Sequence, residues 1–234
     1  MNRQQQGFSL VEMAIVLVIV GLMIGGLITP LATQMEQRRA SETQKAMDEA
    51  KEALIGYALR YGYLPCPAVS AFNGLEDRAE QRCRNGKRQG FLPWATLGVA
   101  KSDGWNHLFR YSVTPAFSDS GNLFTLATAR DISVLTRDGA GRPAPATAAN
   151  DIPAVILSHG KNGWGATGEQ GGRSPEPAAG SGDERVNASL GTTFVSRAAS
   201  DGSTGPGGEF DDMLVWVSPN ILYNRMVAAQ RLPQ

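Results

Sequence analysis

The sequence predicts an α+β protein with one long N-terminal helix, a small antiparallel β-sheet head and a short C-terminal helix. An uncharged run from Met13 to Met35 leads into apolar residues at three- and four-residue spacing as far as Tyr61. Short β-branched runs follow residue 108. The 234 residues suit one membrane helix and one head. The net charge of +0 argues against a nucleic-acid-binding surface.

The N-terminal helix is expected in two halves. The 21 residues 8–28 span about 31 Å as a helix, which matches a hydrocarbon core of about 30 Å. We therefore expect a transmembrane or filament-core helix over residues 8–33 and an amphipathic half over residues 34–62. The apolar run is too long for a secretory signal peptide. Glu12 near its start is costly in hydrocarbon and so indicates a functional site.

The six residues from Gly7 to Glu12 (GFSLVE) resemble the N-terminal motif of type IV pilins and type II secretion pseudopilins. In that family a glycine precedes the cut, an aromatic residue follows it, and a glutamate is the fifth mature residue. The resemblance implies a leader peptide of residues 1–7, removed by a prepilin peptidase, and N-methylation of Phe8. It also assigns assembly to Phe8, Glu12, Gly21 and Pro30. Glu12 would neutralise the Phe8 amine of a neighbouring subunit.

The resemblance implies a structural, non-enzymatic subunit of a type IV pilus or pseudopilus filament. Its partners would be identical or related pilin subunits, the prepilin peptidase, an inner-membrane assembly platform and the membrane. The subunit would cross the inner membrane once, with its head in the periplasm, before it joins a periplasmic or extracellular filament. Two alternatives stay open: a membrane-anchored periplasmic binding or sensor protein, and a minor tip pilin that binds DNA or a surface.

Residues 63–234 are expected to form the head. Export would place Cys66 and Cys83 where disulfides persist, and a bridge between them would close loop 66–83. In the chain-entropy account that bridge stabilises the fold by about 3 kcal/mol. The alternative is two free buried thiols.

The predicted strands are short apolar runs in the second half of the chain. They are Leu108–Val113, Leu123–Ala129, Ile132–Thr136, Ala154–Leu157 and Met213–Val217. In the first of these, Phe109, Tyr111 and Val113 should share one face. Ser218 and Pro219 predict the start of a C-terminal helix that reaches about Gln230.

Residues 158–212 are expected to form one long glycine-rich loop. Its beginning and its end at Asp211 and Asp212 resemble the region where major pseudopilins of type II secretion bind calcium. The resemblance makes calcium the one candidate cofactor, with Asp211 and Asp212 as ligands; the alternative is a flexible surface loop. Gly163–Gly168 matches G-x-G-x-x-G, but the glycine- and proline-rich sequence after it does not predict the helix that a dinucleotide site needs.

Overall fold

The computed structural model describes residues 9–202 and 204–232, and for residues 24–30 it describes the backbone alone. The first element, α1 (Leu10–Tyr61), is a continuous helix that passes through Gly21 and Pro30. It ends at the predicted residue, because Gly62 follows in the left-handed conformation with φ of 86°.

The chain forms two compact units, one within residues 1–41 and one within residues 42–234. The amphipathic segment of α1 from residue 42 onward therefore belongs to the same unit as the predicted head. The first unit contains the apolar part of α1.

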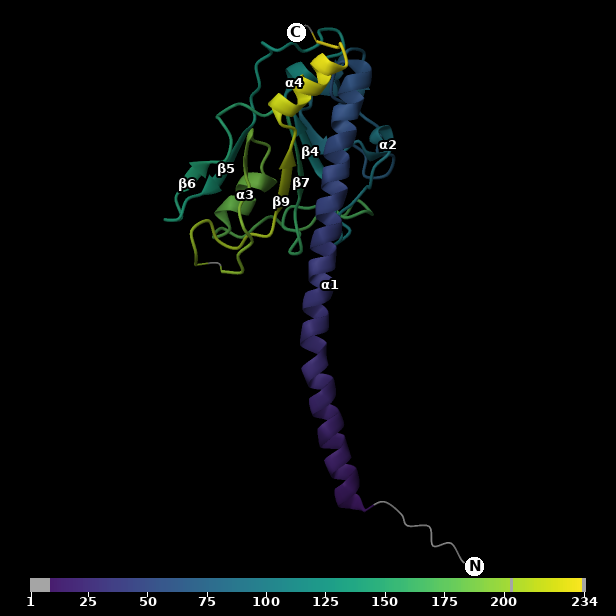
Figure 1. The fold of residues 1–234 in the computed structure, drawn as a ribbon, viewed down its shortest axis with the longest axis vertical. Helices are drawn as coiled ribbons and strands as arrows, with labels where there is room; N and C mark the ends of the chain where they lie inside the picture. The colour runs from purple at the N-terminus through teal and green to yellow at the C-terminus, as the bar shows by residue number, and fades with distance from the viewer. Residues whose placement is uncertain (1–8, 203, 233–234) are drawn as a thin grey trace, which may run out of the picture. The chain divides into compact units, whose positions relative to one another are not determined.

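The central sheet of the second unit is antiparallel and has the strand order β3-β4-β7-β9. Figure 1 labels β4, β7 and β9 of this sheet. Its strands are β3 (Gln89–Phe91), β4 (Arg110–Val113), β7 (Ala154–Ser158) and β9 (Met213–Trp216). The last three lie within or close to predicted strands. The sheet joins segments from distant parts of the chain and provides the frame for the rest of the unit.

One face of this sheet packs against residues 42–61 of α1 and against α4 (Pro219–Ala228). Phe109, Tyr111 and Val113 all point into this core, as their alternation predicted. The helices contribute Met47, Ala50, Leu54, Ile55 and Ala58 from α1, and Leu222 and Met226 from α4. The amphipathic half of α1 is thus one wall of the main hydrophobic core.

The opposite face of the central sheet is covered by a second, three-stranded sheet. Its strands are β6 (Pro143–Pro145), β5 (Ser133–Arg137) and β8 (Thr193–Val195), with β5 parallel to β8. Val134 and Phe194 from this sheet pack on Val155, Leu157 and Leu214. Strand β7 is therefore buried on both faces, which explains its continuous apolar sequence.

The prediction of a strand over Leu123–Ala129 is wrong. Within this segment Phe124 alone is a buried large side chain, and its ring lies 4.7 Å from that of Phe117. Leu123 and Leu126 are about half exposed. The segment has no second inward-facing position, so it forms turns around one anchoring ring.

The prediction of one glycine-rich loop over residues 158–212 is also wrong in part. The segment contains α3 (Gly182–Ala188) and β8. Both elements bury side chains, with Asn187 and Phe194 at 0% and 3% exposure. The glycines alternate with short structured pieces that cover the central sheet.

The Cys66–Cys83 disulfide is present and encloses the small hairpin of β1 (Arg78–Ala79) and β2 (Arg82–Cys83). Glu76, inside the closed loop, accepts hydrogen bonds from the Tyr57 hydroxyl and from the backbone N–H of Cys66, each at 2.9 Å. The loop is therefore fixed to α1 by a carboxylate as well as by the disulfide. The short helix α2 (Trp94–Leu97) follows the loop.

Candidate functional site

The N-terminal motif lies partly outside the described residues, which exclude Gly7 and Phe8. Glu12 is in the first turn of α1, where its Oε2 accepts the Ser9 backbone N–H at 2.8 Å. In return, Ser9 Oγ accepts the Glu12 N–H at 3.2 Å. This reciprocal pair is a capping box, and the spacing S-x-x-E before an apolar run is its sequence signature. In the single chain Glu12 therefore caps its own helix.

The first unit exposes an almost entirely apolar helix surface. Every large hydrophobic side chain from Leu10 to Met23 is at least 44% exposed. A Cβ added at Gly21 would meet no other atom within 4 Å in this chain. A contiguous apolar surface of this kind marks an interaction or membrane-contact site. Within the described residues, no helix has the combination of length and hydropathy required to cross a membrane. The span over residues 8–33 therefore stays a prediction.

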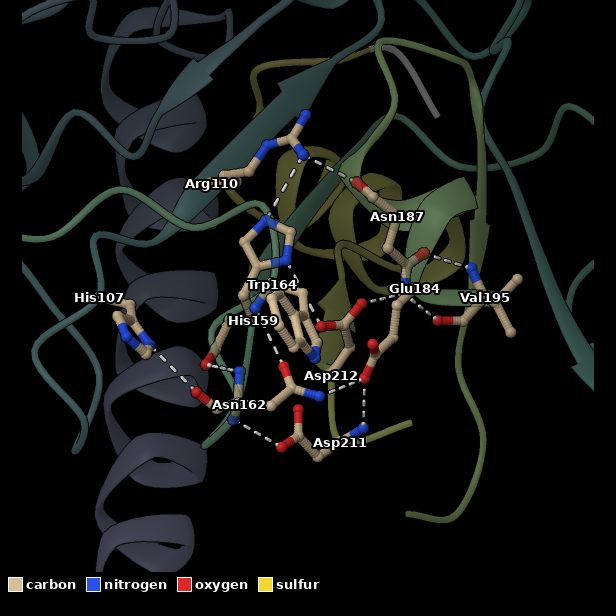
Figure 2. Close-up of polar contacts among 12 residues, drawn as sticks. His107, Arg110, His159, Asn162, Trp164, Glu184, Asn187, Val195, Asp211 and Asp212 are labelled. Carbon is tan, nitrogen blue, oxygen red and sulfur yellow. Dashed lines mark hydrogen bonds and ion pairs between the residues drawn. The ribbon is translucent and has the colours of Figure 1, made fainter. Parts of the chain in front are cut away.

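Three carboxylates converge in the second unit, at the end of the glycine-rich segment (Figure 2). Glu184 comes from α3, and Asp211 and Asp212 come directly before β9. One oxygen from each lies within 4.8 Å of the others, and Glu184 and Asp212 are buried. Asp211 and Asp212 are the two ligands expected from the sequence, and Glu184 is a third that the sequence did not reveal.

One oxygen of each carboxylate is fixed by protein donors. Glu184 Oε1 accepts Asn162 Nδ2 at 2.8 Å and the Asp211 N–H at 3.1 Å. Asp211 Oδ2 accepts the Asn162 N–H at 2.8 Å. Asp212 Oδ2 accepts Asn187 Nδ2 at 2.8 Å. Two asparagines thus hold all three carboxylates in place.

The other oxygen of each carboxylate is buried and has no hydrogen-bond partner among the residues that the structure describes: Glu184 Oε2, Asp211 Oδ1 and Asp212 Oδ1. The nearby His159 Nδ1 lies 3.4 Å from Asp212 Oδ1, which is long for a hydrogen bond. Buried oxygens without partners are rare in proteins and mark sites where an ion or water completes the bonding. Carboxylate oxygens are the ligands that calcium prefers, and one oxygen from each of the three residues lies within 4.8 Å of the others.

The electrostatics of the cluster are those of crowded, buried carboxylates. Burial, together with the neighbouring Asp212 and Asp211 charges, raises the pKa of Glu184 to about 7. Burial likewise raises the pKa of Asp211 to about 6, with the Asp212 charge adding to the effect. Without a cation the cluster therefore takes up protons near neutral pH.

We predict that the metal-free protein loses stability as pH rises from 5 to 8. A carboxyl group with a raised pKa in the folded state binds protons more tightly when folded, so its contribution is complete at low pH and disappears as pH rises through 6 and 7. The expected loss in the free energy of unfolding is about 3 kcal/mol. Urea unfolding in the presence of a chelator, repeated at several pH values, measures this loss in the free energy of unfolding.

His107 contributes to the same pH dependence, because its hydrogen bond with Asp103 raises its pKa. Glu184→Gln isolates the cluster and should flatten the profile; an unchanged slope would contradict the prediction.

Asn187 links the cluster to β8. Its Oδ1 accepts the Val195 N–H at 2.7 Å, and its Nδ2 donates to the Val195 carbonyl at 3.0 Å as well as to Asp212. The side-chain amide thus bonds to the backbone N–H and carbonyl of Val195, as the backbone of a neighbouring strand would. Because Asn187 is fully buried, the glycosylation pattern Asn187-Ala188-Ser189 is inaccessible in the folded chain.

Replacing Asn187 by alanine is expected to destabilise the second unit by about 3 kcal/mol. The change leaves the Val195 N–H and an Asp212 oxygen buried without partners, and each such group costs about 1–3 kcal/mol. Urea unfolding of the two proteins gives the difference. Asn220→Ala, at an exposed position of α4, is the matched control and should change stability by less than about 0.5 kcal/mol. Equal effects for the two variants would contradict the role given to Asn187.

Gly160 allows the chain to close over the cluster. It has φ of 57°, and an added Cβ would lie 2.3 Å from both the carbonyl oxygen and Oδ1 of Asp211. Only glycine fits such an approach without strain. The Gly160 carbonyl lies 3.0 Å from His107 Nδ1, so this ring nitrogen already has a hydrogen-bond partner. His107 is not a member of the carboxylate cluster.

The other acidic residues of the glycine-rich segment do not belong to the carboxylate cluster. Asp183 forms ion pairs at 2.7 Å with Arg137 and with Arg197. Asp201 and Glu209 are not members of the cluster. Gly163–Gly168, the G-x-G-x-x-G match, forms turns and no helix, so the context required of a dinucleotide site is missing there.

Comparison with known proteins identifies a family model at the N-terminus. The family model described as the prokaryotic N-terminal methylation motif matches residues 2–28. No curated protein and no solved structure matches the chain. The matched segment includes the GFSLVE sequence and the capping box at Ser9 and Glu12.

Proposed function

Because the chain carries the N-terminal methylation motif that is characteristic of type IV pilin and pseudopilin precursors, we propose that it is a structural subunit of a type IV pilus or pseudopilus filament. The motif match at residues 2–28 is the observation that carries this proposal. The motif implies processing by a prepilin peptidase and association with other pilin subunits. It also fits a membrane-anchored precursor that later enters a filament.

The proposed path begins with cleavage between Gly7 and Phe8 on the cytoplasmic side and methylation of the Phe8 amine. Residues 8–33 hold the subunit in the inner membrane with its head in the periplasm. An assembly platform in that membrane then transfers the subunit to the filament. The exposed apolar surface from Leu10 to Met23 supports this path, because it needs lipid or neighbouring helices to cover it.

Glu12 has one role before assembly and a second role in the filament. In the isolated subunit its carboxylate caps α1 through Ser9. In the filament it neutralises the Phe8 amine of a neighbour, and an unpaired charge at that depth is costly enough to set the register between subunits. A glutamate oxygen can accept both the Ser9 N–H and an ammonium group, so the first role does not prevent the second.

Mass spectrometry of the protein purified from cells tests the proposal. A filament subunit should begin at Phe8 and carry one added methyl group on the amine. A chain that keeps its first residues would instead support a membrane-anchored periplasmic binding or sensor protein. A minor tip pilin would be processed at Phe8 as well, and its deletion would abolish adhesion or DNA uptake while filaments still form.

We also propose that Glu184, Asp211 and Asp212 bind one calcium ion. The three unpaired oxygens, the two raised pKa values and the oxygen-only donor set support this assignment. The ion would neutralise three carboxylates that the fold otherwise forces together. It would also join α3 to the start of β9, and so secure the segment over the central sheet.

A further inference from the structure

The two sulfurs of the Cys66–Cys83 disulfide differ in access. Cys66 is fully buried, whereas Cys83 is 8% exposed and lines a surface pocket of about 380 Å³. Cys66 is not among the residues that line this pocket. A small molecule that enters the pocket therefore reaches Cys83 first.

The pocket is positively charged and suits an anionic sulfur compound. Arg82 and Lys87 line it, and Asp119 is the one carboxylate in its lining. Asp119 is already engaged, since its Oδ2 accepts Arg82 Nε at 2.9 Å. The lining thus carries a net charge of about +1 beside the disulfide. Cations near a thiolate stabilise it and promote thiol–disulfide exchange.

The polar neighbours of the two cysteines are engaged within the chain. Ser118 Oγ lies 3.3 Å from Cys83 Sγ and donates to the Pro115 carbonyl at 3.1 Å. Beside Cys66, the Glu76 carboxylate accepts the Cys66 N–H and forms an ion pair with Arg78 at 3.1 Å. Access through the pocket is therefore what distinguishes the two sulfurs.

We propose that Cys83 is the exchange sulfur of this protein, that Cys66 is the resolving sulfur, and that the pocket accepts anionic thiols and disulfides of the glutathione class. An incoming thiolate attacks Cys83 Sγ and forms a new S–S bond. The Cys66–Cys83 bond breaks, and its electron pair leaves on Cys66 Sγ as a thiolate, which is protonated when the opened loop admits water. When the reduced chain is oxidised, the Cys83 thiolate attacks the small disulfide and releases one thiolate. Cys66 then displaces the second thiolate and closes the native bridge.

Peptide mapping of the intact, oxidised full-length protein tests which sulfur is attacked. The protein is incubated with reduced glutathione, quenched with acid, alkylated and digested, and the mixed disulfides are located by mass spectrometry. We expect glutathione on Cys83 at least 10-fold more often than on Cys66. Equal labelling, or labelling mainly on Cys66, would overturn the proposal. The experiment needs no mutation, so a folding defect cannot obscure it.

Charge variants test the role of the pocket. Lys87→Glu should slow the reaction with glutathione by roughly 3- to 10-fold and leave the reaction with the neutral thiol 2-mercaptoethanol nearly unchanged. Lys45→Glu is the matched control, because it makes the same change in net charge at an exposed position of α1 outside the pocket. Two outcomes would show that the pocket does not select anionic thiols. In the first, both variants slow the reaction with glutathione equally. In the second, Lys87→Glu slows the reactions with glutathione and with 2-mercaptoethanol equally.

Discussion

Replacing Glu12 by glutamine is expected to lower the incorporation of subunits into filaments by roughly 100-fold or more. Glutamine keeps the oxygen that accepts the Ser9 N–H, so the capping box and the start of α1 should persist. It removes the negative charge that we propose neutralises the Phe8 amine of the neighbouring subunit. Breaking one partner of a buried ion pair costs about 3–5 kcal/mol, which sets the size of the effect. Fractionation of sheared filaments from cells measures incorporation.

Two further variants separate charge from helix capping. Glu12→Ala removes both functions and should be at least as defective as Glu12→Gln. Glu42→Gln makes the same chemical change at an exposed position of α1 in the second unit and should assemble normally. Circular dichroism of each purified variant checks that the head stays folded. If the Glu12→Gln protein assembles normally, the ion pair between Glu12 and the Phe8 amine does not set the register between subunits.

Adding calcium to the chelator-treated protein at pH 8 is expected to raise the free energy of unfolding by about 2.7 kcal/mol when calcium is a hundred times its Kd. The rise should be smaller at pH 5, because protons compete for Glu184 and Asp211, whose pKa values are raised to about 7 and about 6. Thermal or urea unfolding at both pH values provides the measurement. A stability independent of calcium at pH 8 would exclude the proposed ion.

Glu184→Gln is the sharpest variant for the calcium site. The glutamine oxygen can still accept Asn162 Nδ2 and the Asp211 N–H, so the local bonding survives. The negative charge is lost, so the increase in the free energy of unfolding that calcium causes should fall at least 10-fold. Asp201→Asn changes an exposed carboxylate of the same segment outside the cluster and should keep the full response. A full response in the Glu184→Gln protein would place the ion elsewhere.

The long helix could be predicted because its signals are local. Apolar residues at helical spacing identify the amphipathic half of α1, and Gly62 directly after it fixes its end. The alternation of Phe109, Tyr111 and Val113 similarly identifies the inward face of β4. Such patterns report which side of one element is buried, and they hold whatever that element packs against.

The strand predicted over Leu123–Ala129 shows where local patterns fail. Its composition is typical of a strand, yet Phe124 alone inserts into the core, where it stacks on Phe117. Whether a run of apolar residues becomes a strand depends on a partner strand, and this segment has none in the described structure. The glycine-rich segment shows the converse, because β8 forms only where β5 offers it a parallel partner.

The sequence by itself determined the prepilin-type motif, the long helix and its amphipathic half, because each depends on residues within a few turns of one another. It also identified Asp211 and Asp212 as carboxylates at the end of one segment. Only the tertiary structure decided that Glu184 joins them, since Glu184 and Asp211 lie 27 positions apart. They meet when α3 packs beside the segment that leads into β9. The same holds for the unequal access to Cys66 and Cys83, because burial is a property of the packed chain and is not encoded in the spacing of two cysteines.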